Sequence, residues 1–120
     1  MNKAALTAYE TLAPEDAAKT KDALRQQDLA WVQKAQAGDR EAFRCLFERY
    51  QRRAFSIAFG VVRNKETALD VVQDAFHKAY RNLSSFQGNS SFYTWLYRIV
   101  MNLSIDHVRR QQRQKTSTFS

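Results

Sequence analysis

Three side chains with metal-binding chemistry, Asp70, Asp74 and His77, are spaced four and three residues apart. In a helix this spacing places all three on one face, where two carboxylates and an imidazole could coordinate a metal ion. A di-metal helical bundle, however, needs a carboxylate-x-x-His pair on each of two helices, and the chain offers only Asp74-x-x-His77. We therefore predict no metal and no cofactor, and interpret this face as a solvated or protein-binding surface.

Patterns that support enzymatic catalysis are missing from the sequence. It contains no Ser-His-Asp or Cys-His arrangement and no glycine-rich phosphate loop. Asp106 and His107 are chain neighbours, and neighbours in a helix point in different directions, so they do not form a dyad. We predict that the protein is not an enzyme.

Aromatic and cationic side chains are interleaved between positions 86 and 110. The rings are Phe86, Phe92, Tyr93, Trp95 and Tyr97, and the amide and guanidinium side chains among them are Asn89, Arg98, Asn102, Arg109 and Arg110. Bases of single-stranded nucleic acid stack on such rings for about 1–3 kcal/mol each, while cations bind the phosphates. Phe92 belongs by helical spacing to a core stripe, but Tyr93 and Tyr97 spread to its sides. We predict that some rings are exposed and bind single-stranded nucleic acid.

The elements that carry these side chains are predicted to be helices throughout. Only three glycines and one proline occur in 120 residues, and the turn residues that closely spaced strands require are scarce. Gly38 is suited to end one helix in a left-handed conformation, and Asp39 to cap the next helix. We expect an all-α fold, a compact bundle of four main helices over residues 28–37, 40–63, 65–83 and 92–113.

Apolar residues at helical spacing define the expected core. In the second helix they are Phe43, Leu46, Phe47, Tyr50, Ala54, Ile57, Ala58 and Val61, and in the third helix they are Leu69, Val72, Phe76, Ala79, Tyr80 and Leu83. Residues 84–91 are predicted to form a loop that ends in serines suited to N-capping. Residues 1–27 carry few large apolar side chains, so we expect a flexible or loosely helical N-terminal extension, although Pro14-Glu15-Asp16 is typical of a helix start.

Charge and composition limit where the protein works. The 19 Lys and Arg residues outnumber the 12 Asp and Glu residues, and the net charge of +7 favours a polyanionic partner such as nucleic acid. Cys45 is the sole cysteine, so the chain can form no internal disulfide and no thiolate metal cage. Since neither a signal-peptide pattern nor about 20 consecutive apolar residues occur, we expect a cytoplasmic protein without membrane insertion.

Several longer runs of residues stand out along the chain. They are Gly38 to Phe43, Phe47 to Tyr50, Asp70 to Arg81, Ser85-Phe86, and Phe92 to Ile99 followed by Asn102. Together these runs resemble region two of the extracytoplasmic-function sigma factors, over about residues 28–113. The resemblance implies a helical domain that acts in bacterial promoter recognition, as part of transcription initiation.

The resemblance assigns the third helix to polymerase binding. In the family this helix binds the clamp coiled coil of the largest subunit of core RNA polymerase. Its matching residues here are Asp70, Gln73, Asp74 and Phe76. An anti-sigma factor that covers the same surfaces is a further expected partner.

The resemblance also implies that the following loop and the fourth helix bind the non-template strand of the minus-ten promoter element. The positions of a pocket for an extruded base are occupied by Asn82, Ser85, Phe86, Ile99 and Asn102. Stacking and hydrogen bonds to the base edge would offset the few kcal/mol that unstacking costs. The other candidates are Tyr93, Trp95 and Tyr97 for stabilising separated strands, and Arg98, Arg109, Arg110 and Arg113 for binding phosphates.

Complete members of this family carry a second helical domain that reads the minus-thirty-five element, and nothing after Gln114 resembles it. We interpret residues 114–120 as the start of an interdomain linker and expect the chain to be part of a longer protein, with a natural one-domain variant as the alternative. Without the second domain, the chain should bind duplex promoters poorly.

Two other functions are open. A helical adaptor could bind polymerase or a regulator without touching DNA. It explains the arginines near the end of the fourth helix less well, because a protein interface rarely needs such a cluster and the helix dipole alone accounts for only one or two of them. A helix-turn-helix reader of duplex DNA needs a tight turn before a short recognition helix. The loop at residues 84–91 and the long fourth helix fit that arrangement poorly.

Overall fold

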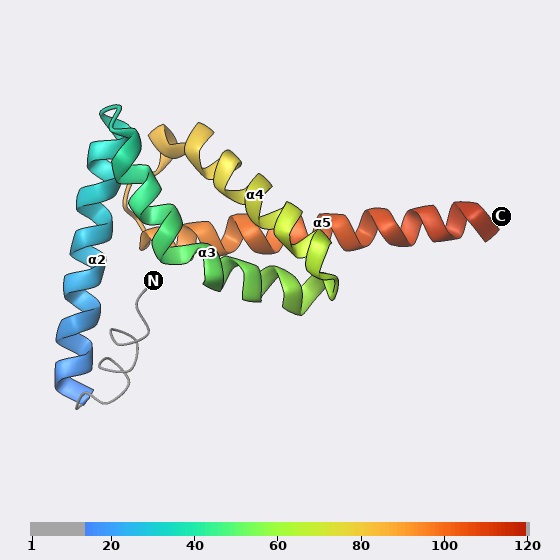
Figure 1. The fold of residues 1–120 in the computed structure, drawn as a ribbon, viewed down its shortest axis with the longest axis horizontal. Helices are drawn as coiled ribbons and strands as arrows, with labels where there is room; N and C mark the ends of the chain where they lie inside the picture. Colours follow the sequence, from blue (N-terminus) through green and yellow to red (C-terminus); the bar gives the residue numbers. More distant parts are fainter. Residues whose placement is uncertain (1–13, 120) are drawn as a thin grey trace. The chain divides into compact units, whose positions relative to one another are not determined.

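The computed structural model describes the backbone of residues 14–119 and the side chains of residues 20–115. Within this range lie four α-helices, one short 3-10 helix and no strand (Figure 1), so the predicted all-α class is confirmed. The elements are α2 (Pro14–Gln36), α3 (Arg40–Val62), α4 (Lys65–Arg81), η1 (Leu83–Ser85) and α5 (Phe92–Phe119). Contacts divide the chain into two units whose boundary falls inside α3, between Arg49 and Tyr50.

Two helices are longer than expected. Helix α2 begins at Pro14, so the expected start at residue 28 is wrong, and the helix-start pattern at Pro14-Glu15-Asp16 is confirmed. Residues 17–27 contain only residues that helices accept, and no glycine or proline interrupts them. Helix α5 continues to Phe119 for the same reason, so residues 114–119, expected as a linker, are helical here. Of the expected extension over residues 1–27, residues 1–13 lie outside the described residues.

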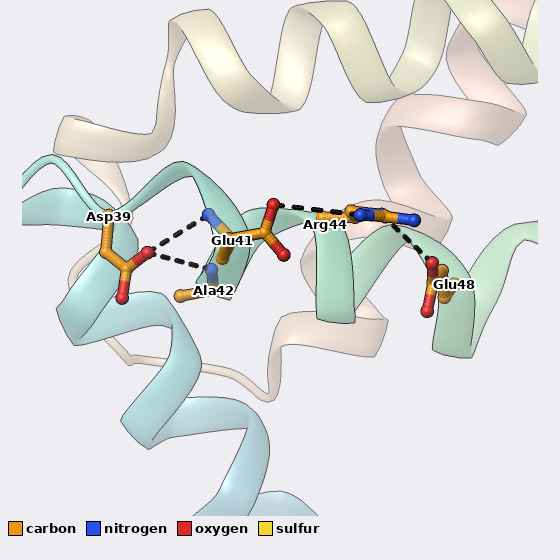
Figure 2. Close-up of polar contacts among 5 residues, drawn as sticks. All are labelled: Asp39, Glu41, Ala42, Arg44 and Glu48. Carbon is orange, nitrogen blue, oxygen red and sulfur yellow. Dashed lines mark hydrogen bonds and ion pairs between the residues drawn. The ribbon is translucent and has the colours of Figure 1, made fainter.

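The turn between α2 and α3 has the predicted chemistry. Gly38 adopts a left-handed φ of 105°, which a glycine reaches without strain. Asp39 caps α3, because its Oδ1 accepts the backbone N–H groups of Glu41 at 3.0 Å and Ala42 at 3.3 Å (Figure 2). Figure 2 also shows Arg44 paired with Glu41 and Glu48 at 3.7 and 3.1 Å. These pairs are exposed, so each contributes less than about 1 kcal/mol.

One arginine joins α2 to α3 in the first unit. The Arg49 guanidinium donates through Nη1 to Asp28 Oδ1 at 2.6 Å and through Nη2 to Gln27 Oε1 at 2.5 Å. Its carbon centre also lies 4.4 Å from the centroid of the Trp31 ring, a cation–π contact. The side chain of Asp28 is only 4% exposed and that of Arg49 19%, so this ion pair is largely shielded from water.

In the second unit α4 packs against α5. The buried face of α4 is rich in alanine and consists of Ala68, Val71, Val72, Ala75, Phe76 and Ala79. Leu69 and Tyr80 were expected in this core and are instead exposed, Leu69 by 52%. The face turned inward is centred on the alanines, because small side chains let helices approach closely. Leu69 lies about 100° around the helix from buried Ala68 and therefore points away from this face.

We expect Asp28→Asn to lower the free energy of unfolding by about 2 kcal/mol, because the shielded Arg49 guanidinium then lacks its anionic partner. Urea denaturation followed by circular dichroism measures this change. Glu41→Gln is the matched control: it also removes one carboxylate, from an exposed pair, and should cost less than about 0.5 kcal/mol. Equal, small losses in both variants would show that the Asp28–Arg49 pair does not secure α2 to α3.

Candidate functional site

The chain between α4 and α5 is shaped by its own polar side chains. The amide Nδ2 of Asn82 donates to the Lys78 carbonyl at 2.9 Å, and the Asn82 backbone N–H donates to the same carbonyl at 3.0 Å. Ser85 donates to the Asn82 carbonyl through both its hydroxyl, at 2.7 Å, and its backbone N–H, at 3.0 Å. Asn82 and Ser85, both exposed, therefore set the path of the loop as well as forming part of its surface.

Phe86 anchors this loop to the start of α5. Its ring centroid lies 5.1 Å from that of Trp95, and it meets Phe92 edge-on at 6.3 Å. Only 8% of Phe86 is exposed. The expectation that this ring lies open for base stacking does not fit the structure, because Phe92 and Trp95 already cover it. Phe86 is better described as a positioning residue for the loop.

The loop leads into α5 through the serine cap that its sequence predicts. The hydroxyl oxygen of Ser91 accepts the backbone N–H of Thr94 at 3.1 Å, and the Ser91 hydroxyl donates to Thr94 Oγ1 at 2.9 Å. Asn89 follows Gly88, whose φ of 78° turns the chain, and Asn89 is exposed. The loop thus presents an amide next to the first turn of α5.

Tyrosine rings and an arginine form a second aromatic group at the beginning of α5. Tyr93 stacks on Tyr50 with centroids 5.5 Å apart and touches Tyr97 at 6.3 Å. The guanidinium of Arg53 lies 4.7 Å from the Tyr93 centroid. Tyr97 is 41% exposed, and Tyr93 and Trp95 are half-buried, which confirms that some rings reach the surface. Arg53 was not among the predicted site residues. Its spacing of three residues from Tyr50 is the only signal in the sequence that places it near these rings.

Polar and cationic side chains continue this surface along α5. At steps of three or four residues one stripe contains Trp95, Arg98, Ile99, Asn102, Asp106, Arg109, Arg110 and Arg113. Asn102 and the four arginines are exposed, while Trp95 and Ile99 are half-buried. The stripe spans about 27 Å at 1.5 Å per residue. At its far end a hollow of about 350 Å³ is lined by Asp106, Arg109, Arg110 and Arg113, a cationic surface suited to phosphate groups.

The outward face of α4 is acidic and carries exposed apolar residues. Asp70, Gln73 and Asp74 are exposed together on this face. Phe76, the fourth candidate for polymerase binding, is buried and only 4% exposed, so it supports the helix from the core. Leu69 and Tyr80 are the exposed apolar side chains on the outward face. Their exposure depends on how α4 is rotated about its own axis. The apolar periodicity of the sequence predicted a different rotation.

Neither a metal site nor a membrane span was found in the described part of the chain. Among these residues no three His, Cys, Asp or Glu side chains are grouped closely enough to hold a metal ion. The His77 ring is instead 3.3 Å from the Arg81 guanidinium. None of the described helices has a stretch long and apolar enough to cross a bilayer.

Comparison with known proteins identifies the family. The family described as Sigma-70 region 2 matches residues 46–114. The RNA polymerase sigma-H factor of Pseudomonas aeruginosa is 43% identical over 84 residues, which are 70% of this chain and 44% of that protein. The ECF RNA polymerase sigma-E factor of Escherichia coli is 44% identical over 91 residues, 76% of this chain and 47% of that protein. The chain therefore spans about half the length of the curated relatives that it matches.

A solved structure with a similar fold is described as "NMR structure of the complex formed by an engineered region 2 of sigmaE in complex with GTAAAA". Its TM-score with this chain is 0.68 at 42% sequence identity, and the match covers 72% of this chain and 90% of that one. The family match, the two relatives and this structure agree. The chain belongs to the Sigma-70 region 2 family, among the extracytoplasmic-function sigma factors.

Proposed function

We propose that the chain is the module of an extracytoplasmic-function sigma factor that binds core RNA polymerase and recognises and melts the minus-ten promoter element. The observation that carries this proposal is the exposed stripe of α5, where an amide and several arginines follow half-buried Trp95 and Ile99. The oligonucleotide bound by the similar region 2 of sigmaE supports a DNA strand as the ligand. This role is not enzymatic, and it belongs to the cytoplasm, where polymerase and promoters are found.

In this proposal each part of the surface has a different task on the non-template strand. Asn102 hydrogen-bonds the edge of an extruded base, and Ile99 and the exposed part of Trp95 contact its apolar face. The hydrogen-bonded turn of Asn82 and Ser85 forms the other wall of the pocket, held in place by buried Phe86. Arg98, Arg109 and Arg110 bind phosphates, which positions the strand without reading its sequence.

Tyr93, Tyr97 and Arg53 extend the same surface. The Arg53 guanidinium lies over the Tyr93 ring, so its charge is held at a fixed place beside exposed Tyr97. We assign Arg53 to a phosphate of the melted strand, and Tyr97 to stacking against a base or to covering the end of the remaining duplex.

The outward face of α4 is proposed to bind the clamp coiled coil of the largest polymerase subunit. Asp70, Gln73 and Asp74 supply hydrogen-bond acceptors and negative charge, and Leu69 and Tyr80 supply the apolar contact that buried Phe76 cannot make. An anti-sigma factor that blocks transcription would need to cover this face or the α5 stripe.

Asn102→Ala should weaken binding of the single strand GTAAAA by about tenfold, or about 1–2 kcal/mol, because the base edge loses its hydrogen-bond partner. Fluorescence anisotropy with a labelled oligonucleotide measures the affinity. The matched control is Gln111→Ala, an exposed amide nine residues further along α5 and therefore on its opposite side. We expect Gln111→Ala to bind like the unchanged protein. Equal losses in the two variants would contradict base reading by Asn102.

Arg53→Ala should lower the affinity for single strands of every sequence to a similar extent, because a phosphate contact carries no sequence information. The slope of log K against log salt concentration should fall by about 0.7, the value for one phosphate contact on a single strand. Arg52→Ala, one residue away and about 100° around α3, is the control and should leave the slope unchanged. An unchanged slope in Arg53→Ala would remove this residue from the DNA surface.

Asp74→Arg should weaken binding to purified core RNA polymerase at least about tenfold while leaving GTAAAA binding intact, because the reversed charge meets the clamp surface that Asp74 complements. Competition against a labelled sigma region 2 measures polymerase binding. Glu48→Arg makes the same charge change at an exposed position of α3 and should bind polymerase normally. If the unchanged chain binds polymerase but binds no oligonucleotide, the adaptor function is the correct one.

A further inference from the structure

A pair of phenylalanines on the outer side of α3 belongs to neither of these surfaces. The rings of Phe55 and Phe59 are stacked with centroids 5.8 Å apart and an interplanar angle of 19°. Phe59 is 43% exposed and Phe55 is half-buried, whereas Ala54 and Ala58, the residues directly before them in the chain, are buried. Two adjacent, ordered aromatic rings at the surface leave apolar area in water, which is unfavourable unless another molecule covers them.

Arginines stand at both ends of this pair. Exposed Arg52 lies one turn before Phe55, and exposed Arg63 lies one turn after Phe59, where its backbone N–H still donates to the Phe59 carbonyl at 2.9 Å. The sequence has no Asp or Glu between Glu48 and Glu66. Helix α3 rises about 15 Å over the ten steps from Arg52 to its last residue, Val62, and Arg63 follows directly with a left-handed φ of 59°. The rings are therefore framed by positive charge on both sides.

Small residues lie beside the rings on the same face. Gly60 is exposed inside α3, and a Cβ added there would meet no atom within 4 Å. Glycine is a poor helix former, and no contact within the described structure requires it at this position. Exposed Ser56 lies four residues earlier. Together Ser56 and Gly60 leave room next to Phe59 for the backbone of a second helix to approach closely.

We propose that this surface, the Phe55–Phe59 ridge (Arg52, Phe55, Ser56, Phe59, Gly60 and Arg63), binds an acidic amphipathic helix of a partner protein. The apolar stripe of that helix packs on the two rings and into the space at Gly60. Its acidic residues, about three turns apart, pair with Arg52 and Arg63. This inference is independent of the DNA and polymerase surfaces, since it uses none of their residues.

Charge selects this occupant over a second copy of the chain or a nucleic acid. A second copy would place arginine ends against a chain with a net charge of +7. A nucleic acid would satisfy the arginines, but Phe55 and Phe59 cover part of each other's faces, and the space beside Gly60 lies on the surface of a helix. Both features suit the side chains of a packed helix better than a series of stacked bases.

The test is selection from a displayed library of helical peptides of about 20 residues, long enough to span the ridge. One face of the peptides is randomised, and the full chain is the target. We expect enriched peptides to combine an apolar stripe with acidic residues near both ends. They should bind Phe59→Ser and Gly60→Gln at least about tenfold more weakly. Enrichment of peptides that bind both variants unchanged, or of peptides without acidic residues, would overturn the proposal.

Gly60→Gln separates binding from folding, because glutamine is the better helix former and the site is open. Its melting temperature should equal or exceed that of the unchanged protein while the selected peptides lose affinity. Leu69→Ser removes an apolar side chain of α4 that is slightly more exposed than Phe59, and it should leave peptide binding unchanged. Two further results would reject an acidic helix as the partner. One is that single-stranded DNA displaces the selected peptides from the chain and that Phe59→Ser weakens binding of this DNA. The other is that the chain self-associates and Phe59→Ser abolishes the self-association.

Discussion

The close packing of α4 against α5 depends on alanines, and both proposed binding surfaces follow from it. Ala68, Ala75 and Ala79 are completely buried, so a larger side chain at any of them would displace α4 from its place in the second unit. With the alanines turned inward, the acidic residues of α4 must face outward. The same packing brings the end of α4 near the start of α5, so that η1 and a short loop suffice to connect them.

The aromatic residues around the beginning of α5 divide between two tasks. Phe86 and Phe92 are buried and build the core under the loop, whereas Tyr97 is exposed. Trp95 does both, since it contacts Phe86 and remains half-buried at the surface. A ring that is fixed by its neighbours loses little further freedom when a base stacks on it, which favours binding. In the proposed function the core rings thus support DNA binding without needing to touch DNA.

Local features of this protein could be predicted from the sequence, and tertiary ones could not. The helical class, the Gly38 turn and the Asp39 cap are encoded within a few neighbouring residues, and the structure has all three. The exposure of Leu69 and the burial of Phe86 depend on side chains that periodicity does not see. The Arg49–Asp28 pair and the Arg53–Tyr93 contact join residues more than 20 positions apart, so no local pattern announces them.

The double role of Asn82 limits how the base preference of this surface can be redesigned. Its amide closes the last turn of α4, and its carbonyl holds Ser85, so one residue is both a helix terminator and part of the proposed pocket wall. A substitution chosen only for a new base contact would also alter where α4 stops. Useful libraries would keep Asn82 and randomise Ile99 and Asn102, whose side chains cap no helix and can be exchanged without rebuilding the loop.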